Sequence, residues 1–148
     1  MRIVFTVATA AVLLIACTPS TKPATTAPAG SVVAGSFTES ELTARLRAAG
    51  LTIEDAGQVE QPFFTRRAHV FVVNGEDLQV YQFASAEAAA NAAAEVAPTG
   101  GSIGTTMMTW MASPHFYRKE RVIAIHIGSN DAVTRALGEA MGPQFAGQ

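Results

Sequence analysis

The sequence predicts an α+β domain, in which three helices pack on an antiparallel sheet of about six strands, in the order α-β-β-β-α-β-β-β-α. The hairpin signal Asn74-Gly75 lies between two runs rich in β-branched and aromatic residues. Three segments with helical spacing each begin after a residue able to cap a helix, namely Thr38, Ser85, and Ser129 or Asn130. Strands therefore come in groups between helices, as in an antiparallel sheet covered by helices.

The chain begins with an apolar run, Ile3–Ile15, that follows Arg2 and ends at Leu14-Ile15-Ala16-Cys17. These four residues resemble the lipobox of bacterial lipoproteins, where a small residue precedes an obligatory cysteine. The resemblance implies a signal peptide, residues 1–16, that is removed, and a Cys17 that carries diacylglycerol and a fatty acid such as palmitate. Cys17 is the only cysteine, so no disulfide competes for its thiol. A transmembrane helix needs about 20 apolar residues, so an ordinary secretory signal is the main alternative.

Residues 17–36 combine the lipidated cysteine with a tract of Thr, Pro, Ala, Ser and Gly whose only charge is Lys22. Such a tract buries too little apolar surface to offset its ordering entropy, so we expect a disordered tether. Residues 37–148 are then a single globular domain. Without residues 1–16 the chain has nine Lys and Arg against twelve Asp and Glu, a net charge of −3. This acidic balance argues against a nucleic-acid partner.

The first half of the domain is expected to contain a helix, three strands and a second helix. Thr38 and Glu41 form a capping box, and Gly50 can adopt the left-handed conformation that ends the first helix. The other elements follow from apolar alternation and turn residues: strands 51–54, 68–73 and 78–83, with Glu76-Asp77 in the turn, and an alanine-rich helix at about 86–97.

The second half is expected to repeat this order. Strands are predicted at Met107–Met111, His115–Arg118 and Arg121–Ile127, and a helix over Asp131–Met141. Residues 81–88 align with residues 125–132, since in both an apolar strand is followed by a serine and an acidic first helical turn. This match indicates a possible internal duplication, and generic helix capping is the alternative.

Short motifs give the domain its resemblance to known proteins. Pro114-His115-Phe116-Tyr117-Arg118 follows Trp110, and Gly128-Ser129-Asn130-Asp131 and a terminal Phe145-Ala146-Gly147 come after it. With these motifs, residues 36–148 resemble a set of small bacterial lipoproteins of unassigned activity. The resemblance implies no catalytic residue.

The histidines do not indicate catalysis. His69, His115 and His126 have no acidic residue at a short fixed spacing to orient them, and His69 and His126 are expected to be half-exposed strand residues. The chain also lacks His-Glu-x-x-His, Gly-x-Ser-x-Gly, a phosphate-binding glycine loop and Cys-x-x-Cys. No catalytic residue is assigned, no cofactor is expected, and an enzyme is not predicted.

Met108, Met111 and His115 are the candidate metal ligands, because thioether and imidazole groups suit Cu(I). Alternation along the expected strand puts Met108 and Met111 on opposite faces, so at most two methionines converge. The favoured interpretation is that Trp110 and its neighbouring methionines are core residues. The alternative is that Trp110 belongs to a binding surface.

Two further groups of residues are candidates for a binding surface. The first is a basic rim for lipid headgroups or another anionic envelope component, with solvated turn charges as the alternative: Arg66, Arg67, Arg118, Lys119 and Arg121. The second is an aromatic patch, whose residues can instead seal the edge of a core: Pro62-Phe63-Phe64 and Pro114-His115-Phe116-Tyr117.

Together these patterns predict a cell-envelope lipoprotein that is a non-enzymatic binding or interaction module. It is expected on the extracytoplasmic side, on the outer membrane or the outer face of the plasma membrane, and held there by diacylglycerol on Cys17. Its expected partner is an envelope protein or an anionic envelope component. A small envelope hydrolase, a Cu(I) or other metal carrier, and a structural protein without a small ligand remain the alternatives.

The anchoring prediction is tested by Cys17→Ser. Because a hydroxyl does not replace the thiol in lipid transfer, the variant should lose labelling by a radioactive fatty acid and should accumulate as uncut or misprocessed precursor. Labelling and the amino-terminal sequence of the product are the measurements. A variant that still partitions into detergent and matures at the same position would contradict the lipobox interpretation.

Overall fold

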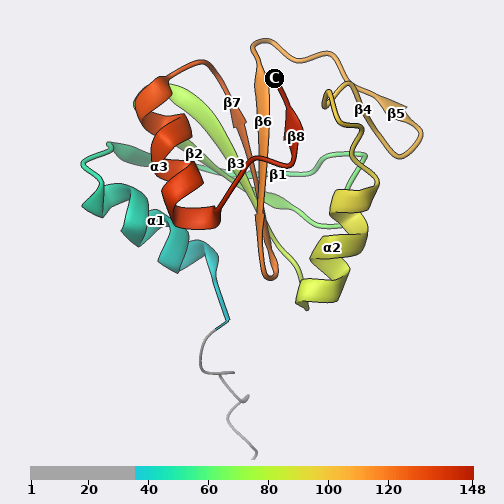
Figure 1. The fold of residues 1–148 in the computed structure, drawn as a ribbon, viewed down its shortest axis with the longest axis horizontal. Helices are drawn as coiled ribbons and strands as arrows, with labels where there is room; N and C mark the ends of the chain where they lie inside the picture. The colour runs from blue at the N-terminus through green and yellow to red at the C-terminus, as the bar shows by residue number, and fades with distance from the viewer. Residues whose placement is uncertain (1–35) are drawn as a thin grey trace, which may run out of the picture. The chain divides into compact units, whose positions relative to one another are not determined.

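The computed structural model describes residues 36–148, which contain a six-stranded antiparallel sheet in the order β1-β2-β3-β7-β6-β8 (Figure 1). The predicted lipobox, Cys17 and the predicted tether up to residue 35 lie outside the described residues. The strands of the sheet are β1 (Ile53–Val59), β2 (Ala68–Val73), β3 (Glu76–Gln82), β6 (Pro114–Lys119), β7 (Val122–Ile127) and β8 (Ala146–Gly147). A second, two-stranded sheet pairs β4 (Ser102–Ile103) with β5 (Thr106–Met107).

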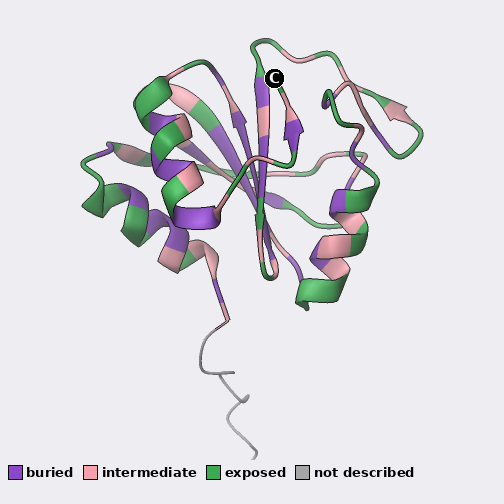
Figure 2. Ribbon diagram, in the orientation of Figure 1, coloured by how far each residue is buried: buried purple, intermediate pink, exposed green. Residues whose placement is uncertain are grey.

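Three helices cover the sheet on both faces, which confirms the predicted α+β class. Helices α1 (Glu39–Ala48) and α3 (Asp131–Met141) lie side by side on one face, and α2 (Ala86–Ala94) lies on the other (Figure 1). Side chains alternate along each strand, so β7 contributes Val122 and Ala124 to the α1/α3 core and Ile123 and Ile125 to the α2 core. Figure 2 shows that burial is concentrated in the central strands of the sheet. Among residues 36–148, no helix has both the length and the apolar character needed to cross a bilayer.

The predicted helix caps are confirmed. Thr38 Oγ1 accepts a hydrogen bond from the Glu41 backbone N–H at 3.2 Å, and Asn130 caps α3. Gly50 has φ +84°, the left-handed conformation expected at the end of α1. The other half of the capping box is not formed, because the Glu41 carboxylate pairs with Arg45 on the next turn instead.

The hairpin at Asn74-Gly75 is confirmed, with φ values of +50° and +85° and Val73 paired with Glu76. The prediction that Glu76 and Asp77 extend the turn was wrong, since both residues lie in β3. A two-residue turn with two positive φ values matches the twist of the paired strands, so the ladder resumes at once.

The strand predicted at Met107–Met111 was wrong. Strand β5 ends at Met107, and residues 108–113 cross the end of the sheet without pairing in it. The Trp110 indole N–H donates to the Gly100 carbonyl at 2.7 Å, which holds this segment against its own loop. The sixth strand is instead β8, where Gly147 (φ +101°) lies against Pro114 so closely that a Cβ would clash with the Pro114 carbonyl.

Two hairpins, each followed by a helix, occur in succession, as the sequence alignment predicts. Tyr81 and Ile125, which align, both lie in the α2 core. However, α2 and α3 cover opposite faces of the sheet. The correspondence between the two halves therefore ends at the helices, and duplication stays a prediction.

Candidate functional site

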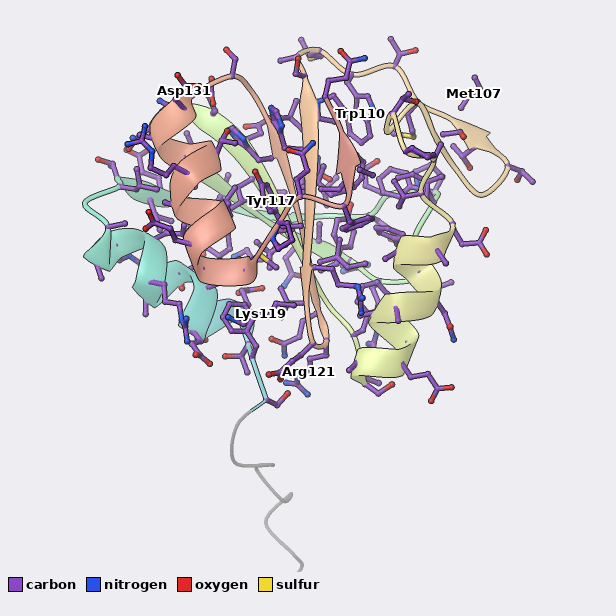
Figure 3. The ribbon with its side chains drawn as sticks, viewed as in Figure 1. Met107, Trp110, Tyr117, Lys119, Arg121 and Asp131 are labelled. Carbon is purple, nitrogen blue, oxygen red and sulfur yellow. The ribbon has the colours of Figure 1, made fainter. Side chains whose placement is uncertain are left out.

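The register of the sheet places the loops of the domain at two opposite ends. The registers of β2, β3, β7 and β6 place four residues in one row across the sheet: Ala68, Tyr81, Ile123 and Arg118. The loop 60–67 precedes the first of these residues and the turn at 120–121 follows the last, so both lie beyond the same end of the strands. The Phe37 N–H donates to Glu120 at this end, which we call the entry end because the chain joins the domain there. The hairpin turn 74–75 and the loop 99–113 are at the other, distal end, as Lys119, Arg121, Met107 and Trp110 show in Figure 3.

The distal loop exposes apolar side chains. Met107 is 82% exposed and Met111 is fully exposed. Trp110 between them is half-buried, with its ring packed edge-on against Phe63 (centroids 6.4 Å apart) and Phe116 (5.8 Å). Trp110 is thus neither the strand core residue that the sequence favours nor a free surface residue: one side of the ring seals the α2 core and the other reaches the surface.

Two hollows flank the half-buried rings. One, of about 430 Å³, is lined by Met108, Trp110 and the carboxyl-terminal Gln148. The other, of about 590 Å³, lies between Phe63 and the β4–β5 turn. We call the whole area the distal surface, made of Met107, Met108, Trp110 and Met111 of the distal loop and of Phe63, whose ring reaches them from the loop 60–67. The sequence missed Phe63 as its partner, because the contact with Trp110 joins residues far apart in the chain.

The other predicted aromatic residues do not form a binding patch. Phe116 is completely buried in the α2 core, and Pro114 and Tyr117 are buried as well. His115 is half-buried and projects to the α1/α3 face, where its Nδ1 meets the Gln144 side chain at 2.9 Å. These residues seal the sheet, which is the alternative that the sequence left open.

The structure does not bring the three candidate metal ligands together. Met108 packs against the α2 core, Met111 projects into solvent, and His115 lies on the opposite face of the sheet. Within residues 36–148 there is also no group of three His, Cys, Asp or Glu residues placed to hold a metal ion.

His126 forms a buried pair with Glu76 that the sequence did not reveal. The sequence predicts a half-exposed His126, but the residue is completely buried, and its Nε2 lies 2.7 Å from the Glu76 carboxylate. That carboxylate also accepts the backbone N–H groups of Ser129 and Asn130, both at 3.0 Å. Gly128 is required beside it, because a Cβ there would stand 2.2 Å from the carboxylate oxygen.

The electrostatics of this pair keep His126 neutral and Glu76 charged. Burial lowers the pKa of His126 below its usual value, although the Glu76 carboxylate opposes this. Burial would raise the pKa of Glu76, but the hydrogen bonds from Ser129, Asn130 and His126 lower it overall. Glu76 therefore joins the β2–β3 hairpin to the start of α3, and its place in the fold is structural.

His69 stands between two carboxylates at the side of α1. Its Nδ1 lies 2.7 Å from Glu39 and its Nε2 lies 3.0 Å from Asp55, which sits just before a bulge in β1. Burial disfavours the charged imidazole, but the hydrogen bonds and charges of Asp55 and Glu39 raise the pKa of His69 overall. With both ring nitrogens facing carboxylates, the protonated imidazole is favoured, and neither nitrogen is free to act as a base.

The five residues of the predicted basic rim all lie at the entry end, but they play different parts. Arg66, Arg67 and Arg118 are exposed, and Arg67 reaches Glu60 at 3.5 Å. Lys119 donates to the Ala140 carbonyl and lies over the Phe37 ring, so it is tied to the α1/α3 core. The loop 60–67 and the 120–121 turn are three strand spacings apart, about 14 Å, so the residues form two groups rather than one rim.

Comparison of the chain with protein-family models, with curated proteins and with solved structures finds no match. The geometry of the two ends of the sheet is therefore the basis for a functional proposal.

His126 and His69 are expected to change the stability of the domain in opposite directions when the pH falls. Folding lowers the pKa of His126 below its usual value of 6.5. The stabilisation that the neutral His126 gives the folded state is therefore complete above pH 6.5 and is lost as the pH falls. The lowered pKa of Glu76 acts in the same direction below about pH 4.5. On acidification from about pH 7.5 to 5, we expect the melting temperature of His126→Gln to fall less, or to rise more, than that of the parent chain.

His69→Gln is the matched control. The pKa of His69 is raised by folding, so its stabilisation is complete below 6.5 and is lost as the pH rises. The variant should consequently lose more stability than the parent chain over the same acidification. Melting curves that respond identically in both variants would contradict these assignments.

Proposed function

We propose that the protein is a lipid-anchored protein of the cell envelope that binds a partner protein through its distal surface. The exposure of Met107 and Met111 carries this proposal. Two long apolar side chains that support no core occur in the same loop as the half-buried ring of Trp110, which contacts Phe63, and exposed methionines with aromatic rings are typical of interfaces.

The charge pattern supports a protein partner. No Asp, Glu, Lys or Arg occurs between Glu95 and Arg118, and this stretch includes the whole distal loop. Interface cores are depleted of charge and enriched in aromatic residues and methionine, whose flexible thioether adapts to a partner's surface. Met107 and Trp110 lie at the far end of the sheet from the point where the chain from Cys17 enters, so anchoring leaves this part of the distal surface accessible.

Site-specific cross-linking tests this proposal. Benzoylphenylalanine in place of Met111, in cells that make the full chain, should give one photo-adduct of defined mass, and Met107→Ser in the same chain should weaken that adduct several-fold. Benzoylphenylalanine in place of Glu87, which is exposed at the start of α2, is the control and should not give it. No adduct from position 111, or the same adducts from both positions, would contradict the proposal.

The stability of a second variant separates binding from folding. Met107→Ser combined with Met111→Ser should change the free energy of unfolding by no more than about 0.5 kcal/mol, because exposed side chains contribute little to stability.

A further inference from the structure

The basic residues of the domain are concentrated at the entry end. The chain has ten Lys and Arg, of which Arg2 and Lys22 precede the described residues. Five of the remaining eight belong to the entry end: Arg66, Arg67, Arg118, Lys119 and Arg121. Whatever lies next to this end of the molecule therefore meets most of its cationic side chains, even though the domain as a whole is acidic.

An open pocket of about 460 Å³ lies beside the loop 60–67 at this end. Its wall is polar and carries both signs of charge: Glu39, Gln58, Glu60, Arg66, Arg67 and His69. The bulge in β1 between Asp55 and Gln58 bends the edge strand here, and the ring of His69 is fixed against Phe71, with centroids 4.3 Å apart. The pocket thus has one rigid wall and one wall that carries the exposed arginines.

The charges of the rigid wall are already paired with each other. Glu39 and Asp55 both contact His69, so that group satisfies itself. Within residues 36–148, Arg66 takes part in no ion pair. The Arg67–Glu60 contact is long, at 3.5 Å, and both side chains are mostly exposed, so it contributes little and is easily exchanged. Arg66, Arg67 and Glu60 are therefore the groups available to a ligand.

Two guanidinium groups next to one carboxylate match a ligand that has a phosphate and an ammonium a few bonds apart. Guanidinium groups bind phosphate oxygens through paired N–H donors, and a carboxylate accepts from a primary ammonium. We propose that this pocket holds the phosphoethanolamine headgroup of a membrane phospholipid, with Arg66 and Arg67 on the phosphate and Glu60 on the ammonium.

The position of the pocket relative to the predicted anchor supports this ligand, and to that extent the inference rests on the proposed function. The chain from Cys17 reaches the domain at Ser36, beside the same end of the sheet, and this stretch spans at most about 65 Å. A tether of this kind gives an effective headgroup concentration in the millimolar range, so a site with a dissociation constant of about 1 mM is occupied. A dissociation constant of about 1 mM corresponds to about 4 kcal/mol, so the three contacts must each contribute slightly more than the roughly 1 kcal/mol of an exposed ion pair, as paired guanidinium–phosphate hydrogen bonds do.

Nuclear magnetic resonance titration tests the pocket without the anchor. The chain Thr18–Gln148 lacks Cys17 but keeps both cores, which residues 37–146 form. Glycerophosphoethanolamine, added to about 50 mM, should give saturable amide shifts at 58–69 with a dissociation constant of about 1 mM. Arg66→Gln and Glu60→Gln should each raise the dissociation constant for glycerophosphoethanolamine at least fivefold. Arg135→Gln, on the exposed side of α3, is the control and should leave it unchanged.

The alternative ligands give distinct outcomes. Glycerophosphocholine, whose ammonium has no N–H, should bind at least fivefold more weakly, and so should inorganic phosphate. Equal binding of all three, no saturable shift, or equal losses in Arg66→Gln and Arg135→Gln would each overturn the inference. The assay uses neither Cys17 nor the distal surface, so the double variant Met107→Ser, Met111→Ser should bind glycerophosphoethanolamine as the parent chain does. A chain that fails to bind this headgroup would overturn the lipid inference and leave the proposed protein contact at the distal surface unaffected.

Discussion

The pairing of β3 with β7 is the contact on which the rest of the domain depends. In residues 36–148 it joins the β2–β3 hairpin to the β6–β7 hairpin, and every residue from Val122 to His126 on β7 is buried. Leu78 and Val80 of β3 enter the α1/α3 core from this pair, while Tyr81 enters the α2 core. Each such buried side chain contributes about 1.5–3 kcal/mol, so loss of this one ladder would open both cores together.

Filling both faces of the sheet determines where a ligand can bind. Buried strands offer no access, so the accessible chemistry lies in the loops at the two ends of the strands. The entry end has arginines, a carboxylate and a polar pocket beside the point where the chain joins the domain. The distal end has exposed thioethers and half-buried aromatic rings, and Glu95 is the charged residue that lines the hollow beside Phe63. The two proposed contacts, with lipid at one end and with protein at the other, rest on this separation.

The sequence was a good guide wherever local chemistry decides the structure. Thr38, Gly50 and Asn74-Gly75 each act within one turn, and the structure confirms all three. It was a poor guide where the tertiary fold decides. The strand expected at Met107–Met111 does not form because Trp110 bonds to Gly100, and β8 is too short to give a pattern. Glu39 and Asp55 lie 30 and 14 residues from His69, and Glu76 lies 50 residues from His126, so no short spacing rule reveals these acids.

The orientation of the domain on a membrane tests the account most directly. The proposed lipid-anchored form of the chain, placed in nanodiscs with a gadolinium-chelating headgroup, can be examined by the relaxation enhancement of its backbone amides. The account predicts the strongest enhancement at Arg66, Arg67 and Glu120 and the weakest at Met107 and Met111. Equal enhancement at both ends, or stronger enhancement at the methionines, would contradict it.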